Sequence, residues 1–132
     1  MLFRSNTMAV AQYLRNRFEL SWINYQGLED NPSHETAKKQ FEGKGFSGLM
    51  AFGLGDQETS FRFINNLEMI YHLANLGDCK SLVIHPYSSQ YLSFDEPTRK
   101  KLSIHADLVR LSVGIEAVED ICDDLGQALD SL

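Results

Sequence analysis

Apolar side chains recur at helical spacing in five segments of the chain. This spacing predicts helices over residues 10–18, 31–41, 60–75, 93–103 and 118–132. Asn6 or Thr7 could cap the first helix, and Phe18 would lie on its apolar face. The last helix shows the clearest pattern, because one face collects Val118, Ile121, Cys122, Leu125, Ala128, Leu129 and Leu132. Cys122 is therefore expected to be a buried small hydrophobe.

Four short apolar runs lie between these helical segments and predict strands. They cover residues 22–25, 49–54, 81–85 and 108–113. Helices and strands therefore alternate along one domain, residues 1–132. The expected fold is an α+β two-layer sandwich, with a small, mostly antiparallel four-stranded sheet and helices packed on one face.

Strand alternation singles out Arg110 as a candidate site residue. Successive side chains point to opposite faces, so Val109, Leu111 and Val113 share one face while Leu108, Arg110 and Ser112 share the other. An arginine on the uncovered face could clamp a carboxylate with two parallel hydrogen bonds. A surface salt bridge is the simpler alternative. Ser81 opens another strand, and alternation groups it with Val83 and His85.

The composition excludes several functional classes. The formal net charge of −6 argues against nucleic-acid binding, and the Arg99–Lys101 run is typical of a helix face. No apolar stretch approaches a membrane span and no secretory signal is visible, so a soluble cytoplasmic protein is expected. The glycines at 43, 45 and 48 follow a helix and precede a strand, the reverse of a dinucleotide-binding loop. The four histidines are isolated, which argues against a metal site.

Two strings carry a resemblance to a known family. Residues 76–86 read LGDCKSLVIHP, and residues 107–116 read DLVRLSVGIE. Both resemble stretches of the small C-terminal domain in enzymes of cysteine and methionine metabolism that use pyridoxal phosphate (PLP). Residues 23–28, 37–39 and 48–52 resemble the same domain, so the resemblance spans nearly the whole chain. Within the family, the LGD-x-KS wording is most similar to the O-acetylhomoserine sulfhydrylases.

The resemblance implies roles for three residues. Arg110 matches the arginine that binds the substrate's α-carboxylate, Ser81 matches a serine at the same carboxylate, and Leu82 would supply a main-chain contact beside it. Arg110 and Ser81 are expected to share a face turned toward a larger domain. No catalytic residue, cofactor ligand or metal ligand is expected in this chain. In the parent enzyme PLP acts as the electron sink.

The chain also departs from the family. A complete member is about three times this length, and none of the lysines here lies in the family's Schiff-base string. The PLP-binding N-terminal domain is therefore expected to be a missing partner, and the isolated chain to be inactive. Tyr87 and Tyr91 replace smaller or polar family residues near the substrate; they would narrow the pocket or merely cover the sheet edge.

Three interpretations remain open at this stage. In the first, the chain is a natural piece or truncated product of a sulfhydrylase. In the second, it is the same domain of a cystathionine synthase, a cystathionine lyase or a methionine lyase. In the third, it is a stand-alone α+β module that binds a small carboxylate. The reading frame upstream of Met1 would separate the module from the enzyme domain. The surface that meets the large domain would be exposed in an isolated chain, so self-association into an oligomer is also expected.

Overall fold

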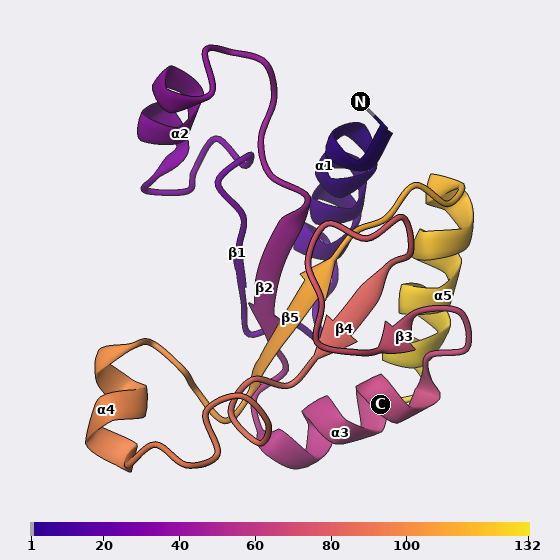
Figure 1. Ribbon diagram of the computed structural model, residues 1–132. Coiled ribbons are helices and arrows are strands. Elements are labelled where there is room, and N and C mark those ends of the chain that lie inside the picture. Colours follow the sequence, from indigo (N-terminus) through magenta and orange to yellow (C-terminus); the bar gives the residue numbers. More distant parts are fainter. Residues whose placement is uncertain (1) are drawn as a thin grey trace.

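The computed structural model describes residues 2–132 and shows one five-stranded mixed sheet (Figure 1). The strand order is β1 (Trp22–Asn24), β2 (Leu49–Gly53), β5 (Leu108–Ser112), β4 (Leu82–Ile84) and β3 (Tyr71–His72). The pairs β1–β2, β2–β5 and β4–β5 are antiparallel, whereas β3 runs parallel to β4. The α+β class is confirmed, but the predicted four-stranded sheet is wrong by one strand.

The additional strand comes from a segment that was predicted to be helical. Helix α3 (Gln57–Asn66) begins at its cap Asp56, which accepts a hydrogen bond from Thr59 N, and it ends well before residue 75. Beyond it, the backbone N–H groups of residues 68, 69 and 70 all donate to the carboxylate of Asp124. These N–H groups cannot make helical hydrogen bonds at the same time, so the chain leaves the helix and continues into β3.

Three helices cover one face of the sheet. Helix α1 (Leu2–Arg15) packs against β1, β2 and α5 (Val118–Asp130), while α3 packs against β5 and α5. The predicted apolar face of α5 is largely buried, although Cys122 is only half-buried. At the centre of the core Phe52 and Phe63 meet edge to face, 5.7 Å between ring centroids.

The first helix differs from its prediction at both ends. It begins at Leu2, so Asn6 and Thr7 lie inside it, buried, and cap nothing. Asn6 instead donates to the carbonyl oxygens of Gly114 and Glu116, which joins α1 to the segment after β5. The helix ends at Arg15, and Phe18 beyond it is 92% exposed instead of packed inward.

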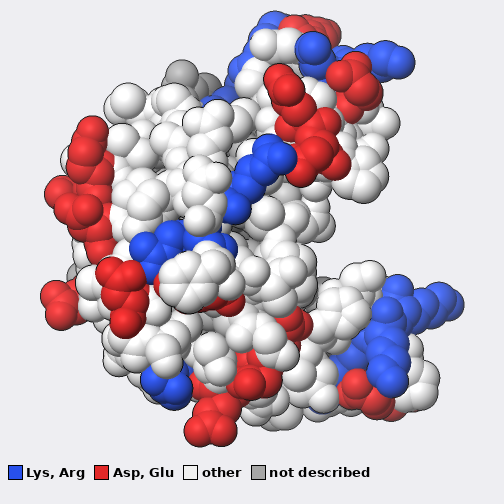
Figure 2. All heavy atoms as spheres, turned by 180° about the vertical axis from the view of Figure 1, so that it is seen from behind, with Lys and Arg blue, Asp and Glu red and all other residues white. Residues whose placement is uncertain are grey.

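Two segments project from the sheet, and we call them the α2 arm (residues 29–47) and the α4 arm (residues 87–106). Helix α2 (His34–Gln40) buries only Ala37, and α4 (Glu96–Lys101) buries no residue. Asp95 caps α4 through Thr98 N, so this helix begins later than its predicted start at residue 93. The Arg99–Lys101 run does lie on this helix, and Figure 2 shows basic side chains over the α4 arm.

The arms leave the second face of the sheet without a helical cover. Figure 1 shows them on the β1 side of the sheet, separated from each other, and the outline in Figure 2 is C-shaped. A site on the sheet is therefore expected on this open face.

None of the helices in the described part of the chain is both long and apolar enough to cross a membrane.

Candidate functional site

Arg110 lies at the middle of β5, with its side chain on the open face. Its neighbours Val109 and Leu111 are fully buried beneath the helices, and strand geometry directs Arg110 the opposite way. In the sheet, Arg110 pairs with Ala51 of β2 and Ile84 of β4. The sheet thus holds the arginine rigidly on its uncovered side, as strand alternation predicts.

A pocket of about 280 Å³ opens beside this arginine. Its apolar floor comes from the sheet, including Leu49 and Ala51. The α4 arm contributes Gln90 and Tyr91, and the chain after β1 contributes polar side chains on the other side. The pocket therefore combines a largely apolar floor with a cation and several hydrogen-bonding groups, a pattern typical of small-molecule sites.

The electrostatics of this pocket depend on how Arg110 is partnered. Its Nη1 donates to Gln90 Oε1 over 3.2 Å. No carboxylate within residues 2–132 forms an ion pair with it, whereas Arg15 and Arg99 each meet one and Arg17 meets two. Burial lowers the pKa of Arg110 from its ordinary value, yet an arginine remains charged at neutral pH. The result is a partly buried cation without a counter-ion, which attracts an anionic ligand.

Ser81 does not join this pocket, which corrects the expectation that it shares a face with Arg110. The side chain is fully buried. Its hydroxyl donates to Glu116 Oε2 over 2.9 Å and accepts from Gly114 N over 3.0 Å, while Ser81 N donates to Glu116 Oε1 over 2.6 Å. Ser81 also lies three residues before Ile84, the partner of Arg110, so about 10 Å separates them along the sheet.

Leu82 is held inside the sheet. It belongs to β4, which lies between β3 and β5, and its register partners are Tyr71 and Ser112. Its side chain is buried. Of the three residues predicted to contact a substrate, only Arg110 lines the pocket. Ser81 is buried in the network around Glu116. Leu82 lies outside the pocket, on the same face of the sheet as Arg110, because it precedes the partner Ile84 by two residues.

A buried histidine anchors the loop that carries Gln90. The carbonyl oxygen of Ala106 can only accept, so the Nε2 of His85 donates to it over 2.8 Å and Nδ1 accepts from Ser88 Oγ over 2.8 Å. Burial lowers the pKa of His85, which favours this neutral form. Sequence patterns missed Gln90 because a loop residue has no periodicity; only its place five residues after the SLVIH strand could have indicated it.

The two tyrosines that depart from the family occupy different places. Tyr87 packs under the guanidinium of Arg99, 4.2 Å from the ring centroid, and donates its hydroxyl proton to Glu96. It therefore belongs to the α4 arm. Tyr91 lines the Arg110 pocket and packs against Phe94. Of the two, Tyr91 is the one placed to limit what fits beside the arginine.

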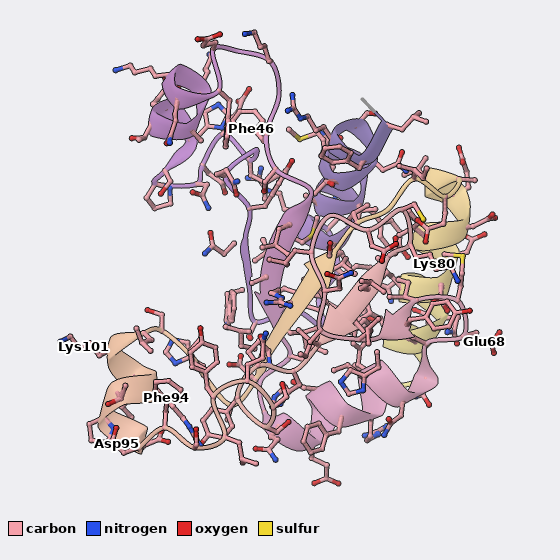
Figure 3. All side chains as sticks on the ribbon, viewed as in Figure 1. Phe46, Glu68, Lys80, Phe94, Asp95 and Lys101 are labelled. Carbon is pink, nitrogen blue, oxygen red and sulfur yellow. The ribbon has the colours of Figure 1, made fainter. Side chains whose placement is uncertain are left out.

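The lysines of the chain lie away from the Arg110 pocket. All six lysines of the chain are exposed, and none lines the Arg110 pocket. Figure 3 shows two of them, Lys80 and Lys101, at opposite sides of the molecule. Within residues 2–132 no group of three or more His, Cys, Asp or Glu side chains is arranged to hold a metal ion.

Comparisons with known proteins identify similar enzymes of sulfur amino-acid metabolism. O-acetyl-L-homoserine sulfhydrylase 1 of Thermus thermophilus is 40% identical over 94% of this chain, and cystathionine gamma-lyase of Bacillus subtilis is 35% identical over 96%. The chain spans only 30% and 33% of these two relatives. A Campylobacter jejuni protein assigned as an O-acetylhomoserine (thiol)-lyase, whose crystal structure holds a pyridoxyl-lysine phosphate group, superposes with a TM-score of 0.93 at 34% identity, covering 97% of this chain and 30% of its own.

A sequence model of one family covers almost the whole chain. It describes the Cys/Met metabolism PLP-dependent enzymes and matches residues 3–130. The chain belongs to this family.

Proposed function

We propose that this chain is the C-terminal, substrate-carboxylate-binding domain of an O-acetylhomoserine sulfhydrylase. The reaction of the whole enzyme converts O-acetyl-L-homoserine and sulfide or a thiol to homocysteine or methionine and acetate. The observation that carries the proposal is Arg110, a partly buried cation on the open face with only a neutral partner. Sulfhydrylases from Thermus thermophilus and Leptospira meyeri, at 40% and 38% identity, support the choice of reaction.

The proposed role of Arg110 is orientation. A guanidinium can hold both oxygens of a carboxylate through two parallel hydrogen bonds, which fixes the direction of an amino-acid substrate. A substrate fixed in this way reacts faster because its orientation is already determined before the chemical step. Ser81 and Leu82 then support the site by holding β4 beside β5, instead of contacting the substrate directly.

The cofactor chemistry is assigned to the part of the enzyme that this chain does not cover. When bound, PLP supplies the electron sink for the reaction. The relatives are about three times as long as this chain, and the exposed lysines here offer no Schiff-base position beside Arg110. We therefore propose that the partner is an N-terminal domain that packs against the open face and brings the cofactor to the Arg110 pocket.

The isolated chain is proposed to lack covalent PLP binding. Incubation with PLP, borohydride reduction and peptide mass spectrometry should give only scattered, low-level labelling of the exposed lysines. Stoichiometric labelling of one lysine would contradict the proposed division of roles.

The proposed carboxylate site can be tested by NMR on the purified chain. O-acetyl-L-homoserine should shift the Arg110 side-chain Nε–Hε resonance, and the analogue with an alcohol in place of the carboxylate should not. Arg110→Met should abolish the response of the pocket amides, whereas Arg15→Met, which removes the same charge from an exposed pair with Asp30, should leave it unchanged. Equal responses from both variants would refute the carboxylate role.

A second candidate is the same domain of a cystathionine lyase. The Bacillus subtilis cystathionine gamma-lyase, at 35% identity, supports it. Grafting this chain in place of the matching segment of the Thermus thermophilus relative distinguishes the candidates. The chimera is expected to be active with O-acetyl-L-homoserine and sulfide. A chimera that is active with cystathionine but not with O-acetyl-L-homoserine would favour the lyase.

A further inference from the structure

We propose that Gln90 is a specificity-determining positioning residue, which holds Arg110 through a neutral hydrogen bond and so keeps the guanidinium charge available for a carboxylate ligand. This inference rests on the proposed carboxylate site. It adds a requirement that the arginine alone does not impose, namely that the residue at position 90 be a hydrogen-bond acceptor without charge.

The contact between the two side chains is the first support. Gln90 Oε1 accepts from Arg110 Nη1 over 3.2 Å, and both residues line the same pocket. This is the side-chain hydrogen bond that Arg110 makes within residues 2–132. A guanidinium has five N–H donors, so one bond at Nη1 leaves the edge formed by Nε and Nη2 free for a bidentate carboxylate.

The absence of charge on Gln90 is the second support. A glutamate has nearly the same shape and would accept the same hydrogen bond, but it would also neutralise Arg110. Three other arginines do have carboxylate partners, for example Arg15 with Asp30 and Arg99 with Glu96. At Arg110 the corresponding partner is an amide, so the attraction for an external anion is not cancelled.

The loop around Gln90 is fixed on both sides, which is the third support. Ser89 Oγ donates to the His85 carbonyl oxygen over 2.6 Å, and Tyr91 N donates to the Pro86 carbonyl oxygen over 3.0 Å. Arg99 Nε also donates to the Tyr91 carbonyl oxygen over 2.9 Å. A loop held in this way presents the Gln90 amide at a constant place relative to the sheet, although the side chain itself is exposed.

The test compares the ligand affinities of two Gln90 variants. Which variant binds more weakly shows whether Gln90 acts through its lack of charge or only through its contact with Arg110. Gln90→Glu keeps the acceptor but neutralises Arg110, and Gln90→Leu removes the acceptor but adds no charge. Gln12→Glu, at an exposed position of α1, adds the same charge elsewhere and serves as the control. Affinity for O-acetyl-L-homoserine is measured on the purified chain from the Arg110 Nε–Hε resonance, with the amide spectrum as the check on folding.

We expect Gln90→Glu to weaken binding about tenfold and Gln90→Leu about threefold, because losing the charge costs more than losing one neutral hydrogen bond. Gln12→Glu should bind as the unaltered chain does. If Gln90 were only structural, the order would reverse, because glutamate preserves the contact with Arg110. That reversal, or wild-type affinity in both Gln90 variants, would overturn the inference.

The outcome also separates this inference from the proposed function. If Arg110→Met abolishes binding while both Gln90 variants bind normally, the carboxylate site stands and the role of Gln90 is wrong. If the unaltered chain shows no response to the carboxylate, or Arg110→Met binds normally, the carboxylate site is wrong and the inference falls with it.

Discussion

Asp124 on α5 fixes the segment that becomes the fifth strand, so its replacement by alanine is expected to destabilise the domain strongly. The carboxylate is buried and accepts three backbone hydrogen bonds, from Glu68 N at 2.8 Å, Met69 N at 3.0 Å and Ile70 N at 2.9 Å. Gln127 donates a fourth bond over 3.1 Å.

The magnitude follows from the burial of these donors. A buried N–H left without a partner costs about 1–3 kcal/mol. Water can reach the exposed Glu68, whereas Ile70 N is buried and Met69 is half-buried. One full penalty and one partial penalty give a loss of about 3 kcal/mol in the free energy of unfolding. That is a large share of the roughly 5–15 kcal/mol that stabilises a typical domain.

Urea unfolding followed by circular dichroism measures the effect. Asp124→Ala should lower the unfolding midpoint by at least about 1 M, given the usual dependence of stability on urea. Asp124→Asn keeps one acceptor oxygen but turns an NH2 group toward the N–H donors, so it should lie between alanine and the unaltered chain. Asp123→Ala, at an exposed position next to it, should change stability by no more than about 0.5 kcal/mol. Equal midpoints for Asp123→Ala and Asp124→Ala would refute the reasoning.

Three further changes test the supports of the site. Ser81→Ala removes the hydroxyl between Glu116 and Gly114 and should cost about 1–2 kcal/mol in urea unfolding; no loss would mean that Glu116 finds another donor. Burial lowers the pKa of His85 from its ordinary value of 6.5, so the unfolded chain binds a proton at this histidine more readily than the folded chain does. Thermal stability should therefore fall as the pH drops below 6.5, and His85→Gln should flatten this dependence. An unchanged slope in His85→Gln would show that another group causes the pH dependence. Gly114→Ala places a methyl group against the Cys79 carbonyl oxygen and should lower the melting temperature by several degrees, whereas an unchanged melting temperature would show that the loop can move aside.

Sequence patterns predicted the elements that bury one face against the core. Helix α5 and strand β5 are examples, because their apolar positions recur at 3.6 and 2 residues and the fold buries those positions. The same logic placed Arg110 on the open face. Periodicity succeeds here because local geometry alone decides which side chains share a face.

Periodicity failed where a distant residue changes the local preference. Residues 67, 70, 71 and 74 fit a helical face, but a carboxylate more than fifty positions later captures the backbone N–H groups between them. The local pattern of residues 60–75 contains no sign that Asp124 will accept these hydrogen bonds. Gln90 was missed for a related reason, since its meeting with Arg110 depends on a loop anchored by His85.

At Ser81, strand alternation and the family resemblance lead to different expectations. Alternation along residues 81–85 already grouped Ser81 with Val83, and both are fully buried. The family resemblance led to the expectation of a serine beside the carboxylate. The structure follows the alternation: the Ser81 hydroxyl donates a hydrogen bond to Glu116 and accepts one from Gly114 N.

The distribution of polar partners supports the proposal that the open face carries the site. Within residues 2–132, every buried side-chain nitrogen and oxygen has a hydrogen-bond partner, and Asp124, Ser81 and His85 use theirs to hold segments together. Arg110 differs, because its charge has no carboxylate partner and its single contact is neutral. A cation held rigidly by a sheet and left uncompensated gains most from an anion that arrives from outside the chain. The same feature that would be a cost in an isolated domain is the driving force on which the proposed carboxylate site depends.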